Sequence, residues 1–137
     1  MDQGPTARRV CHTGQMPHSK TNIDFTALDL AQGFAGYTDR GQGLAERPLS
    51  GALDKAAGTG SRTRMVRMAP GAETPDAHSH PYWEEIYLIE GDLSVGDGKG
   101  GWRELKAPAY ACREPGFMHG PVKTRAGCLM VEFSWYP

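Results

Sequence analysis

The chain is poor in several features that mark large classes of protein. Only three of its 137 residues are cysteines (Cys11, Cys112 and Cys128), and their spacing fits neither a disulfide framework nor a thiolate metal site, so we expect free thiols. No apolar run approaches the roughly 20 residues of a membrane span, and the N-terminus lacks an apolar leader, so a cytoplasmic location without membrane contact is expected. The net charge is −1 with scattered lysines and arginines, which argues against a nucleic-acid partner.

Glycine and proline, in contrast, are abundant. The 18 glycines and 10 prolines interrupt the chain too often for long helices. The length suits one domain with a single core. About ten short strands separated by turns predict an all-β, jelly-roll sandwich or barrel. We expect a flexible N-terminal arm over residues 1–20 and one β domain over residues 21–137.

Alternation of apolar residues locates the expected strands. They are residues 23–30, 33–38, 44–49, 63–68, the segment after Glu84, and residues 93–95, 102–105, 109–113 and 128–135. Residues 50–61 are expected to be a loop, because glycines end the one helical turn that could form there. Cys112 and Cys128 fall on predicted strands, where cysteine usually behaves as a small buried apolar residue.

Four residues have the chemistry and spacing of metal ligands. His78 and His80 are two residues apart, so in a strand their side chains point to the same face about 6.6 Å apart and can bind one ion together. Glu84 follows after a turn that carries Pro81, and His119 would close the site from a distant strand. Three imidazoles and a carboxylate suit iron, manganese, zinc, nickel or copper better than calcium or magnesium.

The same residues carry a family resemblance. The pattern Gly71…His78-x-His80-x3-Glu84-x6-Gly91 resembles the first conserved motif of the cupin superfamily, and the segment 115–119, Pro-Gly-Phe-Met-His, resembles the second. The resemblance implies a small β-barrel that binds one divalent metal through His78, His80, Glu84 and His119. The free coordination positions of such a metal allow chemistry, with Glu84 and His119 as the catalytic candidates.

Other residues are candidates for contact with a substrate. Phe117 and Met118 lie beside His119, and Trp102 is a further aromatic candidate. The strand before the metal loop carries Arg62, Arg64 and Arg67, and an arginine that points into the barrel mouth could hold a carboxylate or enolate bidentately. We assign Arg64 to this role.

Alternation also predicts the direction of side chains on two strands. If Glu84 faces the interior, Ile86 and Leu88 do too, and Tyr87 faces outward. Glu132 on the last strand is a candidate inward acid with a general-base role. Outward aromatic residues such as Tyr87, together with the near-neutral charge, favour a homodimer formed by the strand faces of two barrels.

Two classes of function remain open. The first is a metal-dependent enzyme similar to the cupin dioxygenases that cleave diketones or hydroxyacetophenones, with iron as the expected ion, zinc, manganese or nickel as alternatives, and an aromatic or enolisable ketone as substrate. Lyase or isomerase chemistry is its nearest variant. The second is a metal-containing ligand-binding or sensor domain, because one fold hosts many activities.

Overall fold

The computed structural model describes residues 20–137, and almost all of the regular structure in this range is β-strand. A single short 3-10 helix, η1 (Leu30–Gln32), precedes the strands. The strands are β1 (Thr38–Gly41), β2 (Leu44–Asp54), β3 (Thr59–Met68), β4 (Trp83–Gly96), β5 (Trp102–Lys106), β6 (Ala109–Arg113), β7 (Val122–Lys123) and β8 (Cys128–Trp135). The described residues thus form eight strands, some of them longer than the short strands expected.

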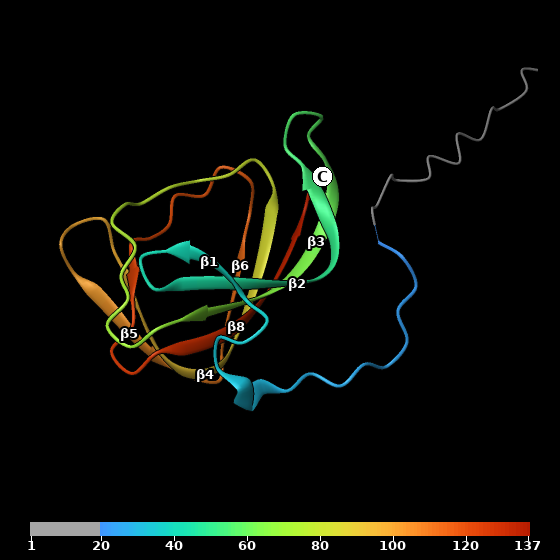
Figure 1. Ribbon diagram of the computed structural model, residues 1–137. Coiled ribbons are helices and arrows are strands. Elements are labelled where there is room, and N and C mark those ends of the chain that lie inside the picture. Colours follow the sequence, from blue (N-terminus) through green and yellow to red (C-terminus); the bar gives the residue numbers. More distant parts are fainter. Residues whose placement is uncertain (1–19) are drawn as a thin grey trace, which may run out of the picture.

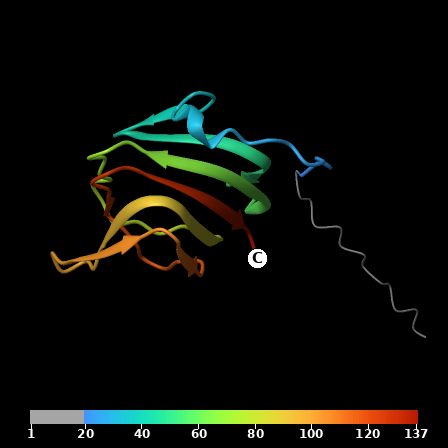
Figure 2. The same ribbon diagram turned by 90° about the horizontal axis from the view of Figure 1, so that it is seen from below.

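All strand pairs are antiparallel, and β4 connects two layers. The order along the sheet is β1-β2-β3-β8-β4-β5; β6 pairs with the first half of β4, and β7 with the second half. In Figures 1 and 2, β2, β3 and β8 form one layer, and the long β4 bends so that β5 and β6 lie in the other. This arrangement confirms the predicted all-β, jelly-roll domain.

Strand register determines which side chains fill the barrel. Residues that face each other across β4, β8 and β3 form three rows: Glu84, Ser134 and Arg62; Ile86, Glu132 and Arg64; and Leu88, Met130 and Val66. The third row continues into an apolar core that also contains Met68, Leu93 and Cys128. Because the first two rows are largely charged or polar, one end of the barrel is an apolar core and the other is suited to a functional site.

The outer face of this layer is covered in part by the segment before β1. Met65 and Leu129 point outward but are only 1% and 0% exposed. Tyr37 Oη lies 3.7 Å from Sδ of Met65, and Nη2 of Arg67 donates to the carbonyl oxygen of Leu30 at 3.0 Å. Farther along the same face Tyr87 is 49% exposed, which agrees with its predicted outward direction.

The expectation of a strand over residues 23–30 is wrong. These residues form no strand, and Ile23 and Phe25 are exposed, because no neighbouring strand pairs with the segment. The carboxylate of Asp24 instead accepts from the backbone N–H of Phe25, and that of Asp29 accepts from Ala31 at the start of η1. Such local bonds compete with strand formation. Of the strand expected over residues 33–38, only Thr38 belongs to β1.

The expectation of a loop over residues 50–61 is also wrong, because β2 and β3 run through most of it. Gly51 and Gly60 have positive φ angles of +69° and +100°, and a Cβ at either would lie 2.1 Å or 2.4 Å from a carbonyl oxygen of the paired strand. These glycines therefore allow a close approach of β2 and β3. A pattern that suggested a loop instead marks a tightly paired hairpin.

Cys112 and Cys128 are free thiols, as predicted. Cys128 is buried in the core, and burial raises the pKa of its thiol to about 11. Cys112, expected to be buried, is exposed because it lies on the outward face of β6. Cys11 and the predicted arm, apart from Lys20, lie outside the described residues. Within residues 20–137 no helix has the length and apolar character needed to cross a membrane.

Candidate metal centre

Three potential metal ligands converge at the polar end of the barrel. His80 comes from the loop before β4, Glu84 from the start of β4, and His119 from the loop between β6 and β7. One ligand atom from each residue lies within 4.8 Å of the other two. Glu84 and His119 are buried, and the side chain of His80 is 9% exposed. Two imidazoles and a carboxylate from separate segments thus form a shielded cluster.

Hydrogen bonds to the backbone determine which nitrogen of each imidazole faces this cluster. Nδ1 of His80 lies 3.0 Å from the carbonyl oxygen of Tyr82, and Nδ1 of His119 lies 2.9 Å from that of Phe117. Since a carbonyl oxygen only accepts, each Nδ1 carries the proton and donates it, and Nε2 of the neutral ring has a free lone pair. Burial lowers the pKa of His119, which favours its neutral form.

Both Nε2 atoms face the carboxylate of Glu84. Its Oε2 lies 3.4 Å from Nε2 of His80 and 3.7 Å from Nε2 of His119. Nη1 of Arg113, on the adjacent strand β6, donates to the same oxygen at 2.9 Å. Burial raises the pKa of Glu84, but the hydrogen bond from Arg113 and nearby positive charge outweigh burial and lower the pKa below its ordinary value. Glu84 is therefore ionised at neutral pH.

His78 lies next to the cluster without belonging to it. The backbones of His78 and His119 exchange two hydrogen bonds, of 2.8 Å and 2.9 Å. The ring of His78 is 4.4 Å from that of His119 and 6.2 Å from that of His80, measured between centroids. Its side chain is exposed, and its nitrogens fall outside the group of converging ligand atoms. The structure thus brings together three of the four predicted ligands and places the fourth beside them.

The donor set fits a divalent transition metal. Nε2 of His80 is buried without a hydrogen-bond partner. Such an unsatisfied group costs about 1–3 kcal/mol unless another species occupies its lone pair. Imidazole nitrogens combined with a carboxylate oxygen suit iron, manganese, zinc or nickel better than calcium or magnesium. His80, Glu84 and His119 are therefore residues that could hold such an ion, with His78 in reach of the same region.

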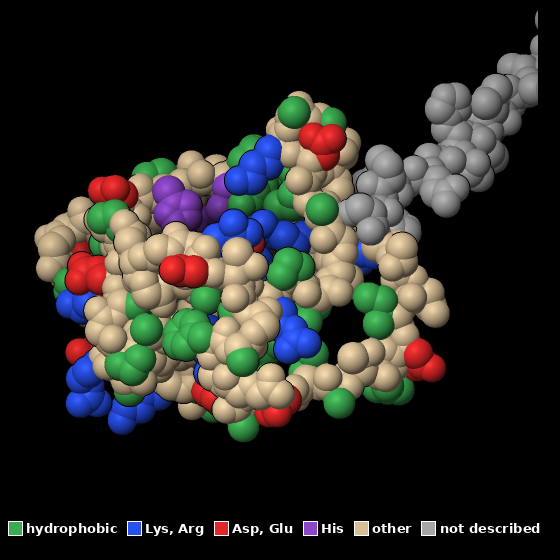
Figure 3. All heavy atoms as spheres, in the orientation of Figure 1, with side chains coloured by type: hydrophobic (Ala, Val, Ile, Leu, Met, Phe, Trp, Pro, Cys, Tyr) green, Lys and Arg blue, Asp and Glu red, His purple; other side chains and the backbone are tan. Residues whose placement is uncertain are grey.

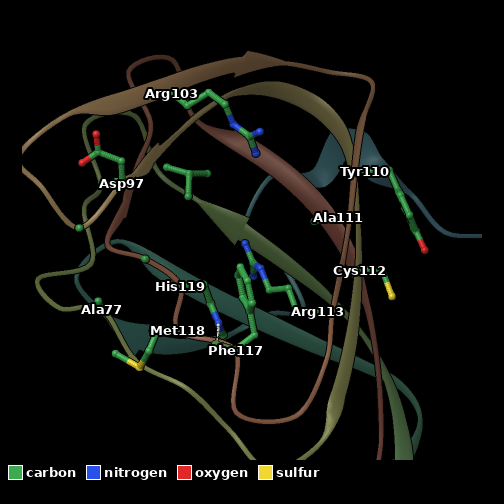
Figure 4. A pocket seen from close by; sticks show the side chains of 14 residues that line it. Ala77, Asp97, Arg103, Tyr110, Ala111, Cys112, Arg113, Phe117, Met118 and His119 are labelled. Atoms are coloured by element: carbon green, nitrogen blue, oxygen red, sulfur yellow. Dashed lines mark hydrogen bonds between the residues drawn. The ribbon is translucent and has the colours of Figure 1, made fainter.

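A cavity of about 820 Å³ borders the cluster at His119. Phe117, Met118 and Arg113 line it on the side of His119, whereas Tyr110 and Cys112 extend from the other face of β6 (Figure 4). Phe117 and Met118 are 51% and 61% exposed, so their apolar surfaces are available to a ligand. Two of the four predicted substrate-contact residues, Phe117 and Met118, thus border a cavity beside a candidate metal ligand.

The predicted contact residue Trp102 is placed elsewhere. It begins β5 and does not line this cavity. The ammonium of Lys123 lies 3.8 Å from the centre of its ring, in a cation–π contact. The structure therefore gives Trp102 a packing partner between β5 and β7.

A second cavity, of about 360 Å³, lies on the inner face of β2, β3 and β8. Its charged lining residues are Arg40, Glu46, Lys55, Arg62, Arg64 and Glu132. Arg64, predicted to bind substrate, has its guanidinium in ion pairs with Glu46 and with Glu132, whose Oε2 lies 2.6 Å from Nη2. Glu132 points inward as predicted; burial raises the pKa of its carboxyl, and the charge of Arg64 opposes that shift.

Arg113 and Ser134 are parts of this region that sequence reasoning missed. Arg113 faces Glu84 from β6, and Ser134 faces it from β8. Both relations depend on strand register, for which the sequence pattern gives no local signal. Tyr82, an aromatic candidate for the lining of the site from the sequence, stacks on His80 with ring centroids 4.1 Å apart.

The fold is shared with cupins of solved structure. An RmlC-like cupin from Shewanella frigidimarina is 19% identical with a TM-score of 0.62, over 87% of this chain and 95% of its own. An acetylacetone dioxygenase from Acinetobacter johnsonii is 16% identical with a TM-score of 0.60, over 99% and 80%. The TM-scores show a common fold, and at such low sequence identities the similarity shows the fold alone.

A third structure is that of Rhodobacter sphaeroides SigE in complex with the anti-sigma ChrR. Its matching chain is 16% identical with a TM-score of 0.55; the match covers 72% of this chain and about half of the other, 47%. No curated protein matches the sequence significantly. Residues 35–136, which include all of the strands and the candidate metal ligands, match the family described as ChrR cupin-like domain. That match spans most of the chain, and the protein therefore belongs to the ChrR cupin-like family.

Proposed function

We propose that the protein is a metal-dependent enzyme for small molecules, and specifically a non-haem dioxygenase that acts on an aromatic or enolisable ketone. The observation that carries this proposal is the convergence of His80, Glu84 and His119 beside a cavity lined by Phe117 and Met118. His78 completes the proposed ligand set. Iron is the expected ion, with zinc, manganese or nickel as alternatives. Such a metal supplies Lewis acidity and, if it is iron, redox chemistry.

The protein's own residues have separate roles in this proposal. Arg113 orients the carboxylate of Glu84 and keeps it ionised. The carbonyl oxygens of Tyr82 and Phe117 hold the two imidazoles so that Nε2 faces the centre. Phe117 and Met118 exclude water from the apolar part of a substrate. Glu84 and His119 are the proposed catalytic residues: His119 lines the cavity, and Glu84 contacts both His119 and Arg113, which also lines it.

Metal analysis and oxygen uptake test this function together. Protein purified without chelator should contain about one transition-metal ion per chain, and His80→Ala should lose it. The iron-loaded protein should consume dioxygen with a diketone, a hydroxyacetophenone or a catechol in an oxygen electrode. Phe117→Ala is the matched variant: it should keep the metal and weaken substrate binding by about 1–3 kcal/mol through lost apolar contact. Full metal content in His80→Ala would refute the proposed centre.

A ligand-binding or sensor role is the second candidate. It is favoured by the ChrR cupin-like family and by the similarity to a chain of the complex between SigE and the anti-sigma ChrR. Under this proposal a small molecule binds at the same metal and alters contact with a partner protein. Tight ligand binding in calorimetry, with no oxygen uptake by iron-loaded protein, would favour this role. Zinc as the sole ion would favour either this role or lyase or isomerase chemistry over a dioxygenase.

We also infer a homodimer. Tyr87, Tyr110 and Phe133 leave 49%, 60% and 41% of their surface exposed, and they occupy neighbouring positions on the outer face of β4, β6 and β8. In such a dimer the same face of a second copy of the chain would pack against this face, and the two copies would be related by a two-fold axis.

A further inference from the structure

The second cavity contains more positive than negative groups. Four of its lining residues are cations (Arg40, Lys55, Arg62 and Arg64) and two are carboxylates (Glu46 and Glu132). Arg40 and Arg64 form ion pairs with these carboxylates. Among the cavity's described residues, Arg62 and Lys55 make no ion pair within 4.0 Å. The cavity therefore has an excess of positive charge that suits an anionic ligand.

Strand register places Arg62 near the metal centre. Glu84 on β4 faces Ser134 on β8, and Ser134 faces Arg62 on β3. Adjacent strands are about 4.8 Å apart, so the backbones of Glu84 and Arg62 are separated by about 10 Å, and both side chains point into the barrel. In Figure 3 the lysine and arginine side chains of this end of the molecule lie next to the histidines. One small molecule can thus reach both Arg62 and a metal held by Glu84.

Three buried polar atoms in this region have no hydrogen-bond partner. They are Nε of Arg62, Oγ of Ser134 and Oη of Tyr136. Ser134 and Tyr136 are 1% and 7% exposed, and they are two residues apart, so they face the same side of the chain. Buried polar groups are nearly always satisfied, and each one that is not costs about 1–3 kcal/mol. Three unsatisfied donors in one region indicate the place of an acceptor.

Aromatic contacts connect these donors to the metal ligands. Tyr136 packs edge-on against Tyr82 with centroids 5.5 Å apart, and Tyr82 stacks on His80. Tyr82 therefore lies between Tyr136 and a ligand of the metal centre.

We propose that Arg62, Ser134 and Tyr136 form a carboxylate-binding subsite beside the metal centre, and that the ligand is a small enolisable keto acid. The guanidinium of Arg62 binds the carboxylate, and the two hydroxyls donate to its oxygens. The ketone end of the ligand then lies toward His80, Glu84 and His119; this orientation rests on the proposed function. Arg64 is unsuited to the role, because Glu46 and Glu132 already occupy its guanidinium.

A matched pair of probes tests the subsite without turnover. The protein is loaded with zinc, and calorimetry measures its affinity for 2,4-dioxopentanoate and for 2,4-pentanedione, the uncharged diketone with the same number of carbons. The wild-type protein should bind the acid at least about tenfold more tightly, which is the range of one charge-assisted, bidentate contact. Arg62→Gln should remove most of this preference, and Arg62→Lys should restore part of it.

Arg103→Gln is the control, since Arg103 lines the larger cavity and not the second one. It should leave the preference for the acid unchanged, and zinc content and circular dichroism should be the same in all variants. Equal affinity of the wild-type protein for both probes would overturn the inference. A preference for the acid that is lost in Arg103→Gln but kept in Arg62→Gln would overturn it too.

The outcomes also separate this inference from the proposed function. Oxygen uptake with the neutral diketone and no preference for the acid would leave a dioxygenase without a carboxylate subsite. Preference for the acid that depends on Arg62, with no oxygen uptake by the iron-loaded protein, would leave the subsite in a ligand-binding protein.

Discussion

At the scale of single residues, Arg113 holds the carboxylate of Glu84, a candidate metal ligand, in place through a hydrogen bond. It is the cation that contacts Glu84, and its bond goes to the carboxylate oxygen nearest to both imidazoles. Partners of this kind orient a ligand and tune its affinity for the metal. Because β6 pairs with β4 at this position, the guanidinium has a fixed place relative to Glu84.

Arg113→Met should therefore weaken metal binding by about 10- to 100-fold, which is typical when a metal-binding side chain loses its hydrogen-bond partner. Methionine keeps the length of the side chain and removes its donors. Competition with a coloured chelator measures the affinity. Arg103→Met is the control, because it changes an arginine of the same cavity for which no contact with Glu84 is found. Equal affinity in the wild type and Arg113→Met would show that Glu84 needs no such partner.

The ligand residues were predictable because their types and spacing are themselves chemical signals. His80, Glu84 and His119 could be chosen from the sequence, and the structure brings them together. Arg62 and Arg64 could not be distinguished in this way, because both alternate inward on β3. Only register shows that Arg64 meets Glu132 and that Arg62 lies in the row of Glu84.

At the scale of elements, Gly91 allows β4 to serve both sheets. β4 shifts register between Leu88 and Glu90 and continues to pair beyond Gly91. Gly91 has a φ of +86°, and a Cβ there would lie 1.9 Å from the carbonyl oxygen of Gly127. No side chain fits without moving the backbone near the start of β8.

Gly91→Ala should lower the free energy of unfolding by about 3 kcal/mol or more, through backbone strain and the clash together. Gly98→Ala is the matched control: its φ is +75°, but nothing lies within 4 Å of the added carbon. It should lose only about 1 kcal/mol. Urea unfolding followed by circular dichroism measures both. Equal losses would show that strain alone, and not the close approach to Gly127, constrains Gly91.

Elements were predictable where local pattern and pairing agree. Residues 109–113 and 128–135 match β6 and β8, because β-rich segments there find partners on β4. Residues 23–30 have strand-like alternation and no partner. Residues 50–61 have loop-like composition, but the end of β2 and the start of β3 pair with each other there, and glycines allow the two strands to come close. Pairing between distant segments decided both cases, and alternation within one segment does not reveal it.

At the scale of the whole molecule, the stabilising core and the candidate site lie at opposite ends of the barrel. The apolar residues of β3, β4 and β8 gather at one end as the core, and the charged residues of the same strands gather at the other. Burial of charge is tolerated because most of these groups are paired, as in the contacts of Arg64 with Glu132 and of Arg113 with Glu84. The unpaired atoms, on His80 and Arg62 among others, are where ligands are proposed to bind.

The outer face of the molecule leads to the last prediction, that two copies of the chain associate through it. Tyr87 on β4 pairs with Tyr110 on β6 and with Val131 on β8. Phe133 lies two residues beyond Val131 on β8, opposite Glu85. Stable dimers usually bury about 800 Å² per partner, with aromatic residues at the centre. Phe133→Asp would place charges against each other across the two-fold axis and should give a monomer in light scattering.

Phe117→Asp is the control for this experiment, because Phe117 is an exposed aromatic residue in the loop between β6 and β7, outside the strands that form the proposed dimer face. It should remain dimeric at the same concentration. Unfolding temperatures of both variants should be measured, so that a monomer caused by unfolding is recognised. If the wild-type protein elutes as a monomer at high concentration, the exposed face of Tyr87 and Phe133 serves some other contact, and the two-fold arrangement is wrong.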